Sequence, residues 1–121
     1  MRTSILKIAV TLAFAFASTA AFAHAQLEKA TPAVGGTVAS ASEIRLEFSE
    51  GVEPRFTGVT LTAAGGASVP LGPAKVQADD AKVLIVPIAK PLSPGAYTVH
   101  WHAVSVDTHH TQGDFQFTVK P

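Results

Sequence analysis

The feature that most constrains this chain is the repeated alternation of apolar and polar residues in short runs. Glu43–Phe48 and Asp114–Val119 alternate strictly, and Ala96–Val104 is the longest run of this kind. A period of two sends successive side chains to opposite faces and is typical of half-buried strands. No segment shows a sustained helical period. The sequence therefore predicts an all-β chain.

Three further runs complete the predicted sheet. Val59–Thr62 alternates, and Lys82–Val86 is a continuous apolar run that favours an interior strand. Val69–Val76 is interrupted by proline and glycine and is interpreted as a weak edge strand or a loop. Short strands at near-regular spacing, separated by glycine and proline, predict a small Greek-key β-sandwich or β-barrel, Ig-like, with about seven antiparallel strands.

The two longest runs also predict which side chains face the core. On Ala96–Val104 the inward set is expected to be Tyr97, Val99, Trp101 and Ala103, and the outward set Thr98, His100, His102 and Val104. On Asp114–Val119 the inward set is Phe115, Phe117 and Val119. The turn between these two strands is expected to close near Gly113, with the polar segment Asp107–His110 at this end of the hairpin.

The first 23 residues are predicted to be a cleaved signal peptide. Arg2 and Lys7 precede the uncharged apolar run Ile8–Ala17, which is shorter than the ~20 residues that span a bilayer. Residues 21–23 read Ala-Phe-Ala, the small-x-small pattern of a cleavage site. We expect a periplasmic protein that begins at His24, with residues 24–121 as one domain. A cut after Ala25 is an open alternative.

The amino-acid composition limits the kinds of partner and of metal ligand that this chain can have. Two of the nine Lys and Arg residues lie in the signal segment, so residues 24–121 carry seven basic and nine acidic residues, and no basic patch appears. That charge balance argues against a nucleic-acid partner. Cysteine is absent, and the single methionine is Met1. A metal site in residues 24–121 would therefore use nitrogen and oxygen ligands, without the thiolates and thioethers that select Cu(I).

Candidate metal ligands cluster in Trp101–His110, which together with the adjoining His100 holds four of the five histidines and includes an Asp-x-His step, Asp107 and His109. The plain alternative is a strand that runs into a histidine-rich polar turn. The remaining histidine, His24, would offer its imidazole and its α-amine together once the signal is cut. With His109 and Asp107 these donors would form a tetragonal N,O set, which suits Cu(II).

These motifs together resemble the CopC family of periplasmic copper-binding, copper resistance proteins. The resemblance spans residues 24–121. Besides His24 and the Asp-x-His step, it rests on Ala30–Ala33, Leu46–Glu50, Gly95–Val99 with Trp101, Val104–His109, and Gly113 with Phe117–Val119. It implies Cu(II) ligands at His24, Asp107 and His109, and it places Glu50 near the ion as a supporting residue or weak ligand.

The chain departs from this family at two places. Residues 63–76, where many members carry a methionine-rich Cu(I) loop, contain neither methionine nor histidine, so the resemblance implies a Cu(II)-only member. His110 stands where the family usually has proline. Neighbouring side chains on an extended turn point apart, which makes His110 the less favoured ligand. His100 and His102 are interpreted as exposed strand residues.

The function that the resemblance implies is Cu(II) binding, for sequestration and resistance or for delivery to a CopD-type inner-membrane copper transporter. The protein is expected to act as a monomer and not as an enzyme. One alternative is a copper monooxygenase with an N-terminal histidine brace, which would need an open coordination position and a broad substrate face. The other is a zinc-binding or purely structural β-sandwich module.

Overall fold

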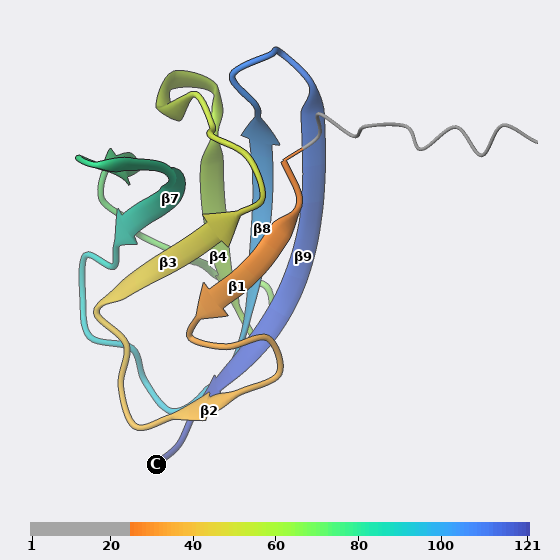
Figure 1. The fold of residues 1–121 in the computed structure, drawn as a ribbon. Coiled ribbons are helices and arrows are strands. Elements are labelled where there is room, and N and C mark those ends of the chain that lie inside the picture. Colours follow the sequence, from red (N-terminus) through yellow and green to blue (C-terminus); the bar gives the residue numbers. More distant parts are fainter. Residues whose placement is uncertain (1–24) are drawn as a thin grey trace, which may run out of the picture.

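The computed structural model describes residues 25–121 and places them in two facing sheets (Figure 1). The four-stranded sheet has the order β1 (Leu27–Thr31), β3 (Glu43–Phe48), β7 (Asp80–Pro87), β6 (Lys75–Gln77). The five-stranded sheet has the order β2 (Thr37–Val38), β9 (His110–Val119), β8 (Gly95–Val104), β4 (Gly58–Ala63), β5 (Ser68–Val69). The predicted all-β sandwich is confirmed.

Of the two predicted alternatives, the structure is the sandwich, because the sheets do not close into a barrel. Residues 25–121 form nine strands, where about seven were predicted. Three of them, β2, β5 and β6, have only two or three residues each, too few for an alternating pattern to be recognised. Strands β5 and β6 lie at the two ends of the run Val69–Val76, which was predicted as one weak edge strand or a loop. One pairing is parallel, because β2 joins the edge beside β9 with Thr37 opposite Thr118.

The predicted core faces are confirmed with one exception. Tyr97, Val99, Trp101 and Ala103 are buried, as are Phe115, Phe117 and Val119. Val104 was predicted to face solvent but is buried, because the segment around the 3₁₀ turn η1 (Pro54–Phe56) packs on the end of β8. The hydroxyl of Thr57 accepts the Val104 N–H at 3.0 Å, and the Glu53 N–H donates to the Val104 carbonyl at 2.8 Å.

Trp101 joins the two sheets. Its ring meets that of Phe48, on β3, edge to face with centroids 5.3 Å apart, an arrangement that aromatic pairs favour. The indole also covers Gly113, which pairs with Trp101 across β8 and β9. The prediction that the hairpin closes near Gly113 was therefore wrong. Glycine is present there because a Cβ would lie 2.8 Å from a ring carbon of Trp101.

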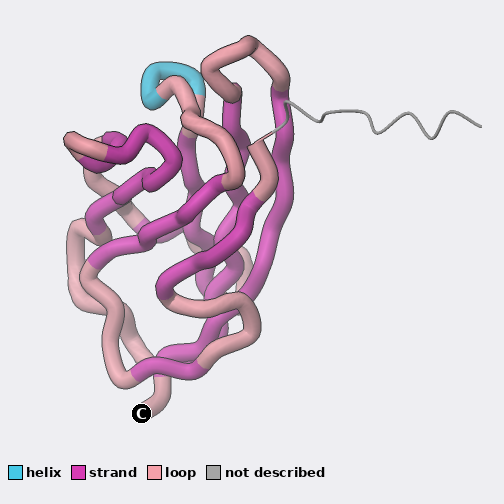
Figure 2. The backbone as a smooth tube through the Cα atoms, viewed as in Figure 1, coloured by secondary structure: helices cyan, strands magenta, loops and turns pink. Residues whose placement is uncertain are grey.

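Two groups of loops mark opposite ends of the sandwich (Figures 1 and 2). The turn between β8 and β9 and the η1 segment share one end, and the connections that enter β3 and leave β7 lie at the other. Within residues 25–121 no helix is long and apolar enough to cross a membrane. The predicted signal segment lies outside the described residues.

Candidate metal centre

The β8–β9 turn holds both metal-ligand candidates of the Asp-x-His step. Its backbone is closed by two hydrogen bonds, from the Ser105 N–H to the His109 carbonyl at 2.9 Å and from the Thr108 N–H to the Ser105 carbonyl at 2.8 Å. Thr108 takes a left-handed conformation, with φ of 73°, which reverses the chain. The predicted polar turn is confirmed. Because the turn is tight, the side chains of Asp107 and His109 lie close together.

Ser105 holds the Asp107 side chain and the His109 backbone in place within the turn. It is fully buried, and its hydroxyl donates a hydrogen bond to Oδ1 of Asp107. The hydroxyl oxygen of Ser105 also accepts the His109 N–H at 3.2 Å. Sequence reasoning assigned no role to this serine. The sequence feature that could have indicated this role is the position of Ser105 two residues before Asp107. A serine hydroxyl at this spacing can bond the local backbone and the carboxylate.

Asp107 and His109 form a close pair. Nδ1 of His109 lies 3.2 Å from Oδ1 of Asp107, and the side chains are 49% and 42% exposed. Two ligands that each bind one ion at about 2.0–2.2 Å lie about 3 Å apart, so this spacing fits neighbouring ligands of a single ion. The same contact also fits an aspartate that orients the imidazole by accepting its Nδ1–H.

The charge of Asp107 is supported by its surroundings. The hydrogen bond from Ser105 lowers the pKa of the Asp107 carboxyl below its ordinary value, and the neighbouring His109 adds to this effect. A group with a lowered pKa remains a carboxylate well into the acidic range. Asp107 is therefore charged under any condition in which a neutral imidazole is available to bind a metal.

The segment around Glu50 lies against this turn. The carbonyl of Gly51 accepts the Val106 N–H at 3.0 Å, and Val52 forms a bridge with Ser105. On the other side of Glu50, the Ser49 N–H donates to the Gln26 carbonyl at 2.8 Å. The backbone thus holds Glu50, which is partly buried, between the turn and the start of the described chain.

His24 lies outside the described residues, so its predicted place beside Asp107 and His109 stays a prediction. Its neighbour Ala25 is fully buried, and the hydroxyl of Thr111, near the start of β9, donates to the Ala25 carbonyl at 2.7 Å. The Gln26 N–H donates to the hydroxyl of Ser49 at 2.9 Å. These bonds hold residue 25 next to the strand that follows the turn.

The other histidines lie on the outer face of the five-stranded sheet. His100, His102 and His110 are exposed, as predicted for the first two. His110 opens β9 opposite Val104 and borders a hollow with Phe56, Val106 and Thr108. Within residues 25–121 no three His, Asp or Glu side chains converge as a ready metal cluster. The described part of the turn supplies a pair of candidate ligands, Asp107 and His109.

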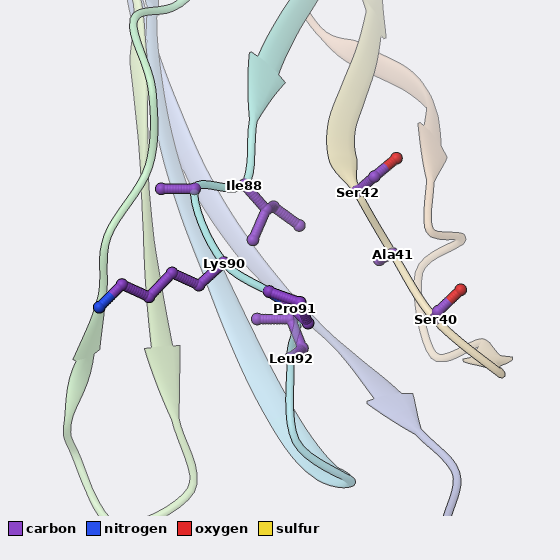
Figure 3. Close-up of a pocket in the computed structure, with 8 residues that line it drawn as sticks. Ser40, Ala41, Ser42, Ile88, Lys90, Pro91 and Leu92 are labelled. Atoms are coloured by element: carbon purple, nitrogen blue, oxygen red, sulfur yellow. The ribbon is translucent and has the colours of Figure 1, made fainter.

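A hollow of about 330 Å³ lies at the opposite end of the sandwich, between residues 40–42 and residues 88–92 (Figure 3). Ile88 and Leu92 reach toward the space from one side, and Ala41 lies on the facing segment. Serine, lysine and apolar residues line it, and none of them is a histidine or a carboxylate. This hollow has no metal-binding chemistry.

Known proteins are similar to this chain over most of its length. Residues 27–120 match the model of the CopC domain. The chain is 47% identical to Protein YobA of Escherichia coli K12 over 100 residues, 82% of this chain and 81% of that protein. It is 39% identical to Copper resistance protein C of Xanthomonas campestris pv. juglandis over 122 residues, 97% of this chain and 96% of that protein.

Solved structures agree as well. The crystal structure of PcoC, a methionine-rich copper resistance protein from Escherichia coli, superimposes with a TM-score of 0.74 and 34% identity, covering 80% of this chain and 99% of that one. CopC from Methylosinus trichosporium OB3b gives 0.75 and 33%, covering 81% and 95%. The predicted family resemblance is confirmed: the chain belongs to the CopC family of copper resistance and copper transport proteins.

Proposed function

We propose that this protein binds one Cu(II) ion through His24, Asp107 and His109 in the periplasm, and sequesters it or passes it to a CopD-type inner-membrane copper transporter. The observation that carries the proposal is the Asp107–His109 pair, whose Nδ1 and Oδ1 atoms lie 3.2 Å apart on a turn fixed by Ser105. Membership in a family of copper resistance proteins supplies the identity of the metal.

The oxidation state follows from the donors. The proposed ligands are nitrogen and oxygen atoms, which suit Cu(II) in a tetragonal arrangement. Cu(I) prefers thiolate and thioether sulfur, but the chain has no cysteine and its one methionine is Met1. PcoC is described as methionine-rich, whereas residues 63–76 of this chain have no methionine. These ligands favour a protein that binds Cu(II) and has no separate Cu(I) site.

His24 is proposed to bind through both its imidazole and its α-amine, which requires cleavage after Ala23. The burial of Ala25 supports this cut over the alternative one. Cleavage after Ala25 would remove a fully buried residue together with the carbonyl that accepts the Thr111 hydrogen bond. Ala25 directly follows His24 in the sequence, so this anchor is one residue away from the proposed ligand.

Asp107 is proposed as a direct ligand and Glu50 as a carboxylate close to the ion. Glu50 is the partly buried carboxylate whose two neighbours bond Gln26 and Val106. The chain also matches 113 residues of Copper transport protein CutJ of Bacillus subtilis, at 28% identity, covering 93% of this chain and 21% of CutJ. A related domain within a longer copper transport protein supports delivery of copper to a transporter.

The proposal is tested by titrating the exported protein, with its N-terminus verified by intact mass spectrometry, with Cu(II) and Zn(II). The native protein should bind one Cu(II) tightly and prefer it to Zn(II). His109→Ala and Asp107→Asn should weaken the first binding event by about tenfold or more. His110→Ala, the adjacent histidine, is the matched control and should leave it unchanged. A preference for Zn(II), or wild-type affinity in the His109 variant, would refute the proposal.

A further inference from the structure

Two histidines and one aspartate occupy adjoining positions on the outer face of the β8–β9 ladder. His100 and His102 stand two residues apart on β8 and face outward. Their partners on β9 are Asp114, opposite His100, and Gln112, opposite His102. Directly opposed side chains have Cβ atoms about 4.5–5.5 Å apart, and diagonal ones remain within reach of long side chains. His100, His102 and Asp114 therefore form a compact triangle.

We propose that this triangle is a second and weaker site for a divalent ion that accepts nitrogen and oxygen ligands, Cu(II) or Zn(II). One edge of the site exists already, because Nδ1 of His100 lies 3.6 Å from Oδ2 of Asp114. That separation is a few tenths of an ångström more than the spacing of two ligands on one ion, about 3 Å. Both side chains are at least half exposed and can adjust by small rotations.

The third ligand, His102, must turn toward the other two. Its ring now rests over Gly58 on β4, where a Cβ would lie 3.0 Å from Cε1 of the imidazole. The ring is exposed, so a rotation about the side-chain bonds toward β9 meets little resistance. Among residues 25–121 no three such side chains converge as they stand, so this site requires the ion to draw His102 toward the other two ligands.

The surroundings leave room for an ion and its water. A hollow of about 390 Å³ is lined by His100, Trp101, Gln112, Gly113 and Asp114, and a second of about 330 Å³ by His102, His110, Thr111 and Gln112. Gln112 borders both hollows, so its side-chain oxygen is available as an additional donor.

The charge of this face also favours a cation. Strands β4, β8 and β9 contain no lysine or arginine, so no basic side chain from them competes for Asp114 or repels an incoming dication. The site is separate from the one proposed above, since Asp107 and His109 lie on the turn beyond these strands. It is expected to bind more weakly, because only two of its three ligands start in contact and all of them are exposed.

The experiment is a Zn(II) titration by calorimetry and a Cu(II) titration followed by Trp101 fluorescence, both on the exported protein. We expect a second, weaker binding event, with further Cu(II) quenching because Trp101 lines the His100 hollow. His100→Ala and Asp114→Asn should each weaken this second event by at least about tenfold. His110→Ala, which leaves the triangle intact, is the matched histidine control, and circular dichroism verifies the fold of each variant.

A His109→Ala background separates this proposal from the proposed function. In this variant, binding at the triangle should persist although binding at the proposed His24–Asp107–His109 site is weakened. Saturation at one equivalent in the wild-type protein, or a second event that His100→Ala and Asp114→Asn leave unchanged, would overturn the second site. If the His109 variant loses only the tighter binding event, the second site remains supported.

Discussion

Thr111 donates a hydrogen bond of 2.7 Å to the carbonyl of Ala25, and so ties the first described residue to the strand that follows the Asp107–His109 turn. The two residues are 86 positions apart in the sequence. Ala25 contributes to the core, so this attachment is part of the fold itself. It supports the proposed copper site, because Ala25 directly follows His24 in the sequence and is itself held beside β9.

The first prediction concerns this attachment. Thr111→Val keeps the shape of the side chain but removes the donor to the Ala25 carbonyl, so the start of the chain should be held less firmly. We expect weaker Cu(II) binding and a loss of about 1 kcal/mol in the free energy of unfolding. Thr118→Val, an exposed threonine on the same strand, is the control. Equal copper affinity in Thr111→Val and wild type would show that the attachment does not support the site.

The second prediction concerns Ser105 and the charge of Asp107. Ser105→Ala removes the donor that most lowers the pKa of the Asp107 carboxyl, so that pKa should rise toward its ordinary value. A lowered folded-state pKa adds stability above the unfolded value, and this is lost as pH falls through the folded value. The variant should therefore lose less of its stability as the pH falls below the ordinary aspartate value of 3.8. Carboxyl NMR titration measures the shift, and an unchanged Asp107 midpoint would refute its assignment to Ser105.

The third prediction concerns the pH dependence of copper binding. Imidazole and α-amine groups in water titrate near ~6.5 and ~7.7–8.0, and both must lose their protons to bind a metal. Asp107 is already a carboxylate in this range because its pKa is lowered. Cu(II) affinity should therefore fall as pH drops through ~6. Copper affinity that stays constant from pH 5 to pH 8 would argue against the histidine and amine ligands.

The fourth prediction concerns the contact between Trp101 and Gly113. Gly113→Ala would place a methyl group 2.8 Å from the indole, so the ring or the strand must shift. Overpacking of this kind costs about 1–3 kcal/mol. We expect a lower melting temperature and a changed Trp101 emission spectrum. Gly51→Ala is the control, because its Cβ would meet Val106 at an ordinary 3.4 Å; a similar small effect in both variants would contradict the account.

Much of this fold was predictable because the long strands carry strict alternation. Glu43–Phe48 was predicted with the bounds that β3 has, and the inward faces of β8 and β9 followed from the same pattern. The pattern is local, so it could not show that residues 54–57 cover Val104 or that Gly113 lies under Trp101. Those contacts join segments far apart in the sequence.

The candidate site was predictable in part. Asp107 and His109 were found because the Asp-x-His spacing lies within one turn. Ser105 was missed because its role depends on burial, which a single serine does not reveal. The position of Glu50 against the turn also depends on a long-range pairing, the bridge between Val52 and Ser105. The pairing of His100 with Asp114 likewise required the register of β8 and β9.

The central claim is that His24 binds Cu(II) through its α-amine and imidazole together. The most direct measurement is Cu(II) titration of two proteins whose N-termini have been verified by intact mass spectrometry, one that begins at His24 and one with a single residue added before it. The added residue converts the amine into an amide and leaves the imidazole in place. We predict a large loss of Cu(II) affinity in the extended protein, and equally tight binding by both would contradict the N-terminal chelate.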